Sequence, residues 1–238
     1  MVDDLLLLGI DTSGKTASAA LFDSDKELFL AESTLYTQKT HSQIIMPIVK
    51  DIISQTDKSI SDIDAIAVAN GPGSYTGLRI GVAAVKAMGF AMNCKCCGIS
   101  TLEGLAFNNI SFKGVICSIM KARGDLVYTC SYKSDGYSLD SITSEKIMST
   151  DELAQFLAFN GTEVLLCGDG SVDFFNNYRS AMFIIASPMG RIQNACGVCL
   201  AALSKQLINV DELEVSYLQK VKAEKDLYDK LQKQEDKK

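Results

Sequence analysis

The spacing of apolar residues over the first hundred positions predicts three strands followed by alternating helices and strands. Short apolar segments separated by the polar turns 13–15 and 23–25 indicate consecutive antiparallel strands. Further on, Ile44, Ile48 and Ile52 recur at helical spacing, and this helix tolerates Pro47 if the proline lies in or near the first turn. The predicted elements are strands at 5–11, 17–22 and 26–33, a helix at 42–54, a strand at 64–69, a helix at 76–93 and a strand at 95–99.

The second half of the chain begins a similar order again. Its first helix is predicted to start at Thr150, a capping residue, with Asp151 and Glu152 in the first turn. The predicted elements are strands at 114–120 and 126–133, a third strand at 137–142 or 145–147, a helix at 150–159, strands at 164–167 and 183–186, and a helix at 192–207. These patterns alone predict a mixed α/β protein with two lobes.

A glycine-rich loop within residues 70–81 joins a predicted strand to a predicted helix. Gly71, Gly73 and Gly77 allow the backbone to turn sharply or to approach another group closely. Ser74 or Thr76 is placed to cap the helix, whose first N–H groups point into the loop. Such a loop can receive an anion or the backbone of a partner.

The spacing of this loop differs from two known phosphate-binding loops. A Walker loop requires Lys and then Ser or Thr after its last glycine, whereas Leu78 and Arg79 follow Gly77 here. The dinucleotide fingerprint requires its last two glycines three residues apart, but Gly73 and Gly77 are four apart. Spacing alone therefore favours a tight strand-to-helix turn over a ligand loop.

Longer motifs show that the chain resembles the TsaB family, bacterial subunits of the machinery that makes threonylcarbamoyladenosine in tRNA. The glycine loop with its arginine is the most specific of these motifs. The matching residues are Leu8-Gly9-Ile10-Asp11-Thr12-Ser13, Ala17-Ser18-Ala19-Ala20-Leu21, His41-Ser42 with Pro47, Gly71-Pro72-Gly73-Ser74-Tyr75-Thr76-Gly77-Leu78-Arg79-Ile80-Gly81, Gly98-Ile99-Ser100-Thr101-Leu102, Ala122-Arg123, Val127-Tyr128 and Tyr217-Leu218. Lys121 and Leu126 stand where family members usually carry acids.

The resemblance implies a duplicated actin-like (ASKHA, ribonuclease H-like) α/β fold with two lobes. Each lobe is expected to hold a mixed sheet with flanking helices. We place the N-terminal lobe at 1–105, the C-terminal lobe at 106–220 and a charged helical tail at 221–238. The tail is rich in Lys, Glu, Asp and Gln, and it is predicted either to stay exposed to solvent or to become ordered against a partner.

Composition narrows the function classes. The 238 residues are 47% hydrophobic, which suffices for a substantial core, and no apolar stretch approaches membrane-spanning length. We therefore expect a soluble, cytoplasmic protein with no membrane partner. The net charge of −6 argues against tRNA binding by this chain alone, because phosphate binding needs a positive surface. Contact with tRNA is expected only through a complex.

The turn after the first strand is a candidate nucleotide contact. In the actin-like fold class this turn can cradle phosphates, and here it contains Asp11, Thr12, Ser13 and Gly14. A hydrogen-bonded hairpin turn is the alternative reading. Thr12 stands where kinase-like members carry glycine, which weakens a catalytic interpretation. The resemblance implies no tightly bound cofactor and leaves open weak ATP or ADP contact with Mg²⁺ at a complex interface.

No catalytic residue and no metal site are predicted. His41 is the sole histidine, and Ile45 occupies the position four residues later, where catalytic relatives of this family carry a second metal-binding histidine. The eight cysteines lie mostly in apolar runs, which is typical of reduced core thiols. Arg79 is expected to pair with an acid of the same chain, with a partner's acid or with a phosphate.

The family pairs through its first-lobe helices, and the resemblance implies the same here. The residues predicted for this dimer or partner interface are Ile44, Ile45, Ile48, Ile52, Gly81 and Ala84. Burial of such stripes inside the chain's own core is the alternative.

The predicted function is that of a non-catalytic scaffold subunit. The chain is expected to form a homodimer when alone. In the complex it is expected to bind the catalytic sister subunit TsaD and to allow the ATPase subunit TsaE to join. The complex forms N6-threonylcarbamoyladenosine next to the anticodon of tRNAs reading ANN codons. The alternative is a small-molecule phosphotransferase of the same fold class, with Asp11 or Asp169 as base. A metallopeptidase is a third reading, against which the lone histidine argues.

Overall fold

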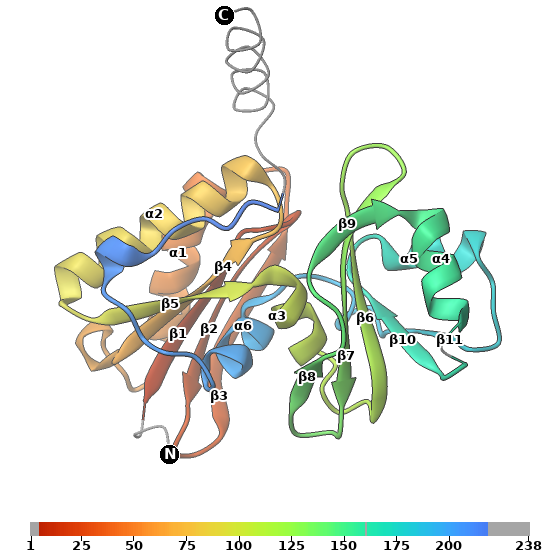
Figure 1. Ribbon diagram of the computed structural model, residues 1–238. Helices are drawn as coiled ribbons and strands as arrows, with labels where there is room; N and C mark the ends of the chain where they lie inside the picture. The colour runs from red at the N-terminus through yellow and green to blue at the C-terminus, as the bar shows by residue number, and fades with distance from the viewer. Residues whose placement is uncertain (1–4, 160, 219–238) are drawn as a thin grey trace, which may run out of the picture.

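The computed structural model describes residues 5–159 and 161–218, which form two lobes side by side (Figure 1). The first lobe contains a five-stranded mixed sheet in the order β3-β2-β1-β4-β5, in which β1 pairs antiparallel with β2 and parallel with β4. Its strands are β1 (Leu6–Asp11), β2 (Thr16–Asp23), β3 (Leu28–Tyr36), β4 (Ala65–Gly71) and β5 (Lys95–Ser100). The order of these strands and helices along the chain matches the first of the two predicted repeats.

Helices cover both faces of the first sheet. On one face α1 (His41–Ser54) and α2 (Tyr75–Met92) bury their isoleucine and valine side chains against residues such as Leu8 and Ile10. On the other face α6 (Ala195–Ala202) packs its small side chains against the strands. The sheet is therefore sandwiched between helices, as its fully buried central strands require.

The second lobe repeats this plan around a sheet in the order β11-β10-β6-β7-β8, with β9 also pairing with β7. Its strands are β6 (Gly114–Lys121), β7 (Leu126–Ser134), β8 (Leu139–Ser141), β9 (Lys146–Ser149), β10 (Val164–Cys167) and β11 (Phe183–Ile185). Helices α4 (Thr150–Phe159) and α5 (Ser171–Asn177) contribute side chains to the core on one face, and α3 (Thr101–Phe107) does so on the other. The predicted duplicated two-lobed α/β architecture is confirmed.

Several predicted elements need correction. The helix expected at 192–207 is shorter, because the Asn194 side chain accepts from the backbone N–H of Cys196 at 3.0 Å and so caps α6 at its start. Helices α3 and α5 were missed, since seven residues are too few for a clear helical period. Both alternatives for the third strand of the second lobe exist, as β8 and β9.

Pro47 lies inside α1 rather than in its first turn. The proline has no N–H to donate, so it removes one helical hydrogen bond. Pro47 and Gln43, four residues before it, are both exposed. Water can therefore reach the carbonyl left without its helical donor, and the helix continues to Ser54.

The lobe boundaries in the chain differ from the predicted ranges. Helix α6 lies within the range assigned to the second lobe, yet its core contacts are with the first sheet. The following segment stays with the first lobe, because Ile208 pairs with Cys96 of β5 and Lys86 of α2 donates to the carbonyl of Asp211 at 3.3 Å. The predicted tail at 221–238 lies outside the described residues.

Candidate functional site

The turn after β1 is built around a buried carboxylate. Oδ1 of Asp11 accepts hydrogen bonds from the backbone N–H of Ser13 at 2.8 Å and from its hydroxyl at 2.6 Å. Burial raises the pKa of Asp11 from its ordinary value of 3.8 to about 6, although the two Ser13 hydrogen bonds oppose this shift. The side chains of Asp11, Thr12 and Ser13 are all buried.

The glycine loop between β4 and α2 packs directly on this turn. The backbone N–H of Ser74 donates to the carbonyl of Ser13 at 2.7 Å, and the Thr12 hydroxyl donates to the carbonyl of Gly77 at 2.8 Å. A Cβ atom at Gly73 or Gly77 would collide with the backbone oxygen of Ser13 or Thr12, respectively. Two of the glycines are therefore required for close approach of backbone from the same chain.

Ser74 caps α2 as predicted. Its side chain accepts from the backbone N–H of Gly77 at 3.2 Å, and the helix begins at Tyr75. The N-terminal turn of the helix thus lies over the Asp11 turn, because the same loop both caps α2 and packs on Ser13.

This packing bears on the predicted nucleotide contact at Asp11, Thr12, Ser13 and Gly14. The first three residues are buried with their side-chain polar groups bonded inside the chain, while Gly14 is half-buried and Lys15 is exposed. The residues present do not form an open phosphate cradle, because the side chains of Asp11, Thr12 and Ser13 are buried and hydrogen-bonded within the chain. Nucleotide contact here stays a prediction.

His41 links α1 to the same turn. Its Nε2 lies 2.9 Å from the carbonyl oxygen of Gly14, so Nε2 carries the hydrogen and donates. The other ring nitrogen, Nδ1, is buried and has no hydrogen-bond partner among the described residues. His41 therefore holds the start of α1 against the turn.

An exposed aromatic cluster lies at the N-terminal end of α2. Nε of Arg79 donates to the Tyr217 hydroxyl at 3.0 Å, and its guanidinium carbon lies 4.0 Å from the centre of the Tyr75 ring. The rings of Tyr75 and Tyr217 stack with their centres 5.3 Å apart. Two of the sequence motifs, the glycine loop and the late Tyr-Leu pair, thus meet at one surface. Sequence reasoning offered acids and phosphate as partners of Arg79 but did not foresee this tyrosine.

The predicted interface residues require correction. Ile44, Ile45, Ile48, Ile52 and Gly81 are buried in the protomer's own core, and Ala84 is half-buried. Their spacing marks the inner faces of α1 and α2, as expected for an amphipathic helix on a sheet. The four isoleucine side chains are therefore covered by the chain's own core, as in the alternative considered from the sequence, and only Ala84 remains partly exposed.

The outward side of α2 is a different apolar stripe, which we call the α2 face. It consists of Ala83, Ala87 and Phe90, at helical spacing, and Phe90 is 81% exposed. The α2 face begins one turn after the Tyr75, Arg79 and Tyr217 cluster. A sequence signal for it existed, because small and apolar residues occupy both sides of this helix.

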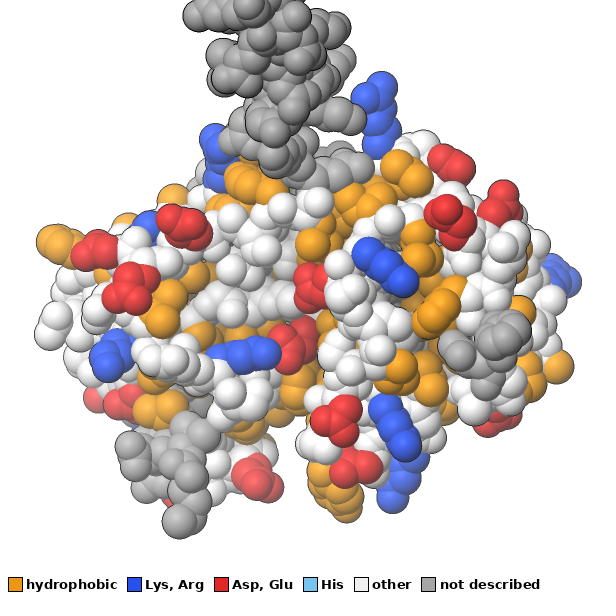
Figure 2. All heavy atoms as spheres, in the orientation of Figure 1, with side chains coloured by type: hydrophobic (Ala, Val, Ile, Leu, Met, Phe, Trp, Pro, Cys, Tyr) orange, Lys and Arg blue, Asp and Glu red, His pale blue; other side chains and the backbone are white. Residues whose placement is uncertain are grey.

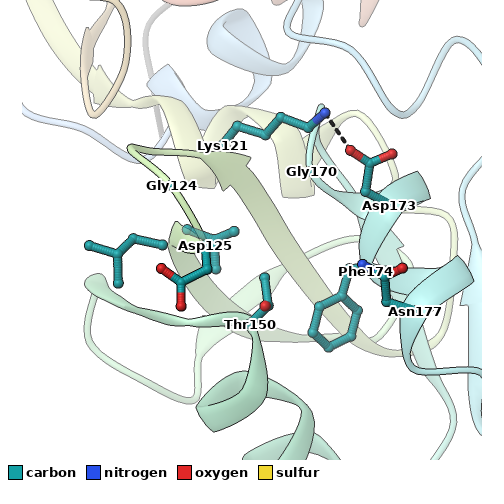
Figure 3. A pocket seen from close by; sticks show the side chains of 10 residues that line it. Lys121, Gly124, Asp125, Thr150, Gly170, Asp173, Phe174 and Asn177 are labelled. Atoms are coloured by element: carbon teal, nitrogen blue, oxygen red, sulfur yellow. Dashed lines mark ion pairs between the residues drawn. The ribbon is translucent and has the colours of Figure 1, made fainter.

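The second lobe has an open pocket of about 310 Å³ between the β6–β7 hairpin and α5 (Figure 3). At its edge Nζ of Lys121 pairs with the Asp173 carboxylate at 2.6 Å, and both side chains are more than half exposed. Asp125 and Thr150 lie on its opposite side in Figure 3. Nearby, the Asp169 carboxylate accepts from the backbone N–H of Lys121 at 3.0 Å, and burial raises the pKa of Asp169.

Metal-binding clusters and membrane-spanning helices are both absent from the described part of the chain. There, no three His, Cys, Asp or Glu side chains come together in a way that could hold a metal ion. Within the same residues, each helix is too short or too polar to cross a bilayer.

Comparison with known proteins first defines the class. The family model of "TsaD: tRNA N6-adenosine threonylcarbamoyltransferase" matches residues 33–206. The solved structure of YeaZ from Pseudomonas aeruginosa superposes with a TM-score of 0.78 over 90% of this chain and 100% of that chain, at 21% sequence identity. The fold and the family model together define a member of the TsaD-related group with a duplicated two-lobed α/β fold.

Sequence relatives then narrow the assignment. The TsaB protein of Bacillus subtilis (strain 168), a tRNA threonylcarbamoyladenosine biosynthesis protein, is 34% identical over 164 residues, which cover 69% of this chain and 71% of the relative. TsaB of Escherichia coli (strain K12) is 31% identical over 54% of this chain and 55% of its own length. The B. subtilis tRNA N6-adenosine threonylcarbamoyltransferase is 29% identical over 60% of this chain and 47% of its own. The chain belongs to the TsaB family.

Proposed function

We propose that this chain is a non-catalytic scaffold subunit of a tRNA threonylcarbamoyl transferase complex. In this role it binds the catalytic sister subunit TsaD and allows the ATPase subunit TsaE to join. The complex then forms N6-threonylcarbamoyladenosine beside the anticodon of tRNAs that read ANN codons. Family membership supports the pathway, and the exposed α2 face supports the docking role.

The observation that carries the scaffold role is the contrast between the two sides of α2. The inner side fills the core, whereas Ala83, Ala87 and Phe90 leave a flat apolar stripe exposed to solvent. Small residues allow another helix to approach closely, and a single large side chain provides an anchor. Arg79 and Tyr217 at the end of the stripe supply polar contacts at its rim. This face suits either a second copy or a homologous subunit.

Charge supports an indirect role on tRNA. The net charge of −6 disfavours phosphate binding by this chain, so a basic partner must bind the nucleic acid. The residues here position that partner; they do not transfer a proton. The buried Asp11 is held by Ser13 beneath the glycine loop and is removed from any substrate in this conformation.

The proposal is tested by reconstitution with sister and ATPase subunits from the same source. Omitting this chain should abolish tRNA modification. Ala87→Arg should lower the modification rate at least tenfold, because a charge is placed in the middle of the α2 face. The matched control is Ala158→Arg on the exposed side of α4, which should leave the rate unchanged. Full modification without the chain, or equal effects of the two variants, contradicts the scaffold role.

The phosphotransferase alternative predicted from sequence is not favoured by the geometry. Its two candidate bases are Asp11, which is fully buried, and Asp169, whose carboxylate accepts from the backbone of Lys121. Phosphate release by the purified chain, lost in an Asp169→Asn variant, is the result that would restore this alternative.

A further inference from the structure

A groove of about 540 Å³ opens between the two lobes at the end of the molecule where the β2–β3 and β7–β8 hairpins lie. One hairpin from each lobe forms a wall, and residues at or beyond the C-terminal ends of α3 and α6 complete the lining (Figure 1). We call this the interlobe groove. It is lined by Phe22, Glu27, Phe29, Phe107, Ile110, Gly136, Tyr137, Ser138, Leu139, Leu200, Leu203 and Ser204.

The lining is mainly aromatic and aliphatic. Phe22 and Phe29 pack against one another with ring centres 4.7 Å apart and form part of one wall. On the other wall Tyr137 is 86% exposed, which leaves a large ring uncovered at the rim. Concave apolar surfaces with a few polar groups are typical of binding sites. The groove uses none of the residues assigned to the α2 face or to the Asp11 turn.

Each of the two hairpins that wall the groove carries a carboxylate. Glu27 is the single charged residue among the described lining residues. On the opposite hairpin the Asp135 carboxylate accepts from the backbone N–H groups of Tyr137 and Ser138 at 2.8 Å each, and these bonds hold its pKa below the ordinary value. The Lys113 side chain lies beside Gly136 and supplies an opposing charge on that side, since a Cβ atom at Gly136 would come within 3.0 Å of its Cε. Figure 2 shows acidic side chains on both sides of the gap at its lower edge, with Lys or Arg side chains beside them on the second lobe.

The C-terminal 20 residues have the complementary composition. Residues 219–238 contain seven lysines and five acidic residues, a net charge of +2, whereas the whole chain carries −6. Their apolar residues are Val221, Leu227, Tyr228 and Leu231. In a helix, positions 227, 228 and 231 share one face. The segment therefore combines a short apolar face with lysines, which matches an apolar groove whose two hairpins each carry a carboxylate.

The groove cannot take this segment from its own chain in helical form. The described chain ends at Leu218, next to Tyr217, which stacks on Tyr75 beyond the carboxyl end of β4. The groove lies at the other end of the sheet, where Glu27 precedes β3. The nine residues of β3 span about 30 Å between these ends. The nine residues from 218 to 227 cover about 14 Å as a helix.

We propose that the interlobe groove binds residues 219–238 of a second copy of this chain. Leu227, Tyr228 and Leu231 pack on its aromatic walls, and lysines of the segment lie beside Glu27 and Asp135. This contact is separate from pairing through the α2 face and does not depend on the tRNA role. Two copies arranged with opposite ends together exchange these segments reciprocally, which closes the assembly as a dimer.

The test uses the full chain with a photo-crosslinking amino acid in place of Tyr137, an exposed position that tolerates replacement. Equal amounts of ¹⁴N- and ¹⁵N-labelled protein are mixed, irradiated and analysed by mass spectrometry. We expect crosslinks between position 137 of one isotope and residues 225–233 of the other. Introducing Leu227→Ser with Leu231→Ser should reduce their yield at least tenfold. The control probe at Ile142, exposed but outside the groove lining, should give no such products.

Crosslinks confined to one isotope, crosslinks to other segments, or no crosslinks at position 137 would each overturn the proposal. A probe at Phe90 reports separately on the α2 face. Crosslinks between copies from position 137 but none from position 90 would contradict self-pairing through the α2 face and leave the groove assignment standing. Crosslinks between copies from position 90 but none from position 137 would contradict the groove assignment alone.

Discussion

The two lobes share a topology but differ at the end of their first strands. In the first lobe β1 ends at Asp11, which is buried beneath the glycine loop. In the second lobe β6 ends at the equivalent Lys121, which is exposed, pairs with Asp173 and borders an open pocket. The two sheets therefore place the ends of their first strands in equivalent positions. The local side chains and loops decide whether that strand end is buried or exposed.

The helices that follow amplify this difference. After β4 the glycine loop leads into the 18 residues of α2, whose first turn lies over the Asp11 turn. After β10 a short turn leads into the seven residues of α5, which leaves space beside the β6–β7 hairpin. A sealed turn with a long helix suits a rigid docking surface, because the helix is held at its N-terminal end by several hydrogen bonds.

The largest expected effect comes from disrupting the contact between the glycine loop and the Asp11 turn in the first lobe. Gly77→Val places a branched side chain against the backbone oxygen of Thr12, where neither backbone can move away. We expect a loss of about 3 kcal/mol or more in the free energy of unfolding, measured by chemical denaturation. Ala158→Val on an exposed helix is the control and should change stability by less than about 1 kcal/mol. Equal stability of the two variants would show that the loop is not packed on the turn.

The second effect concerns the buried carboxylate. Because the folded pKa of Asp11 is raised to about 6 from 3.8, its contribution to stability is fully present below pH 3.8 and is lost as pH rises through 6. The shift corresponds to about 3 kcal/mol. Asp11→Asn should therefore unfold at higher denaturant concentration than the wild type at pH 8, and the advantage should shrink toward pH 4. An advantage that does not change with pH would contradict the raised pKa.

A smaller effect is expected from removing one hydrogen bond between the Asp11 turn and the glycine loop. Thr12→Val keeps the shape of the side chain but removes the donor to the Gly77 carbonyl. The expected loss is about 1 to 2 kcal/mol, because the carbonyl stays buried without its partner. Thr12→Ser, which keeps the hydroxyl, should recover most of this loss in the same denaturation measurement. A Thr12→Val variant as stable as the wild type would show that this hydrogen bond does not stabilise the fold.

The smallest effect is expected at Lys121, the exposed end of the first strand in the second lobe. Lys121→Met removes the exposed ion pair with Asp173, and such pairs contribute about 0 to 1 kcal/mol. We expect a change within this range and a further decrease of the effect in high salt. If Lys121→Met lowered the free energy of unfolding as much as Gly77→Val does, the ends of the first strands would be equally well packed in both lobes. The contrast between the lobes would then be wrong.

The sequence by itself determined the order of the elements and the capped glycine loop. Apolar periodicity is a local property, so β1, β2, β4, α2 and the second repeat followed from it with small errors at their ends. Capping depends on residues within one turn, so the sequence narrowed the cap to Ser74 or Thr76, and the structure shows that it is Ser74. The family motifs supplied the duplicated architecture, which periodicity alone does not specify.

Only the tertiary structure decided which face of each helix is exposed and what the glycines contact. Ile44 and Ile48 share helical spacing with many partner-binding residues, yet the sheet beneath α1 buries them, while Phe90 on the far side of α2 stays exposed. Arg79 donates to Tyr217, 138 residues later, and α6 returns to the first sheet from the second half of the chain. Contacts between residues so far apart depend on how the chain returns to the first lobe after building the second, and local sequence patterns carry no record of that path.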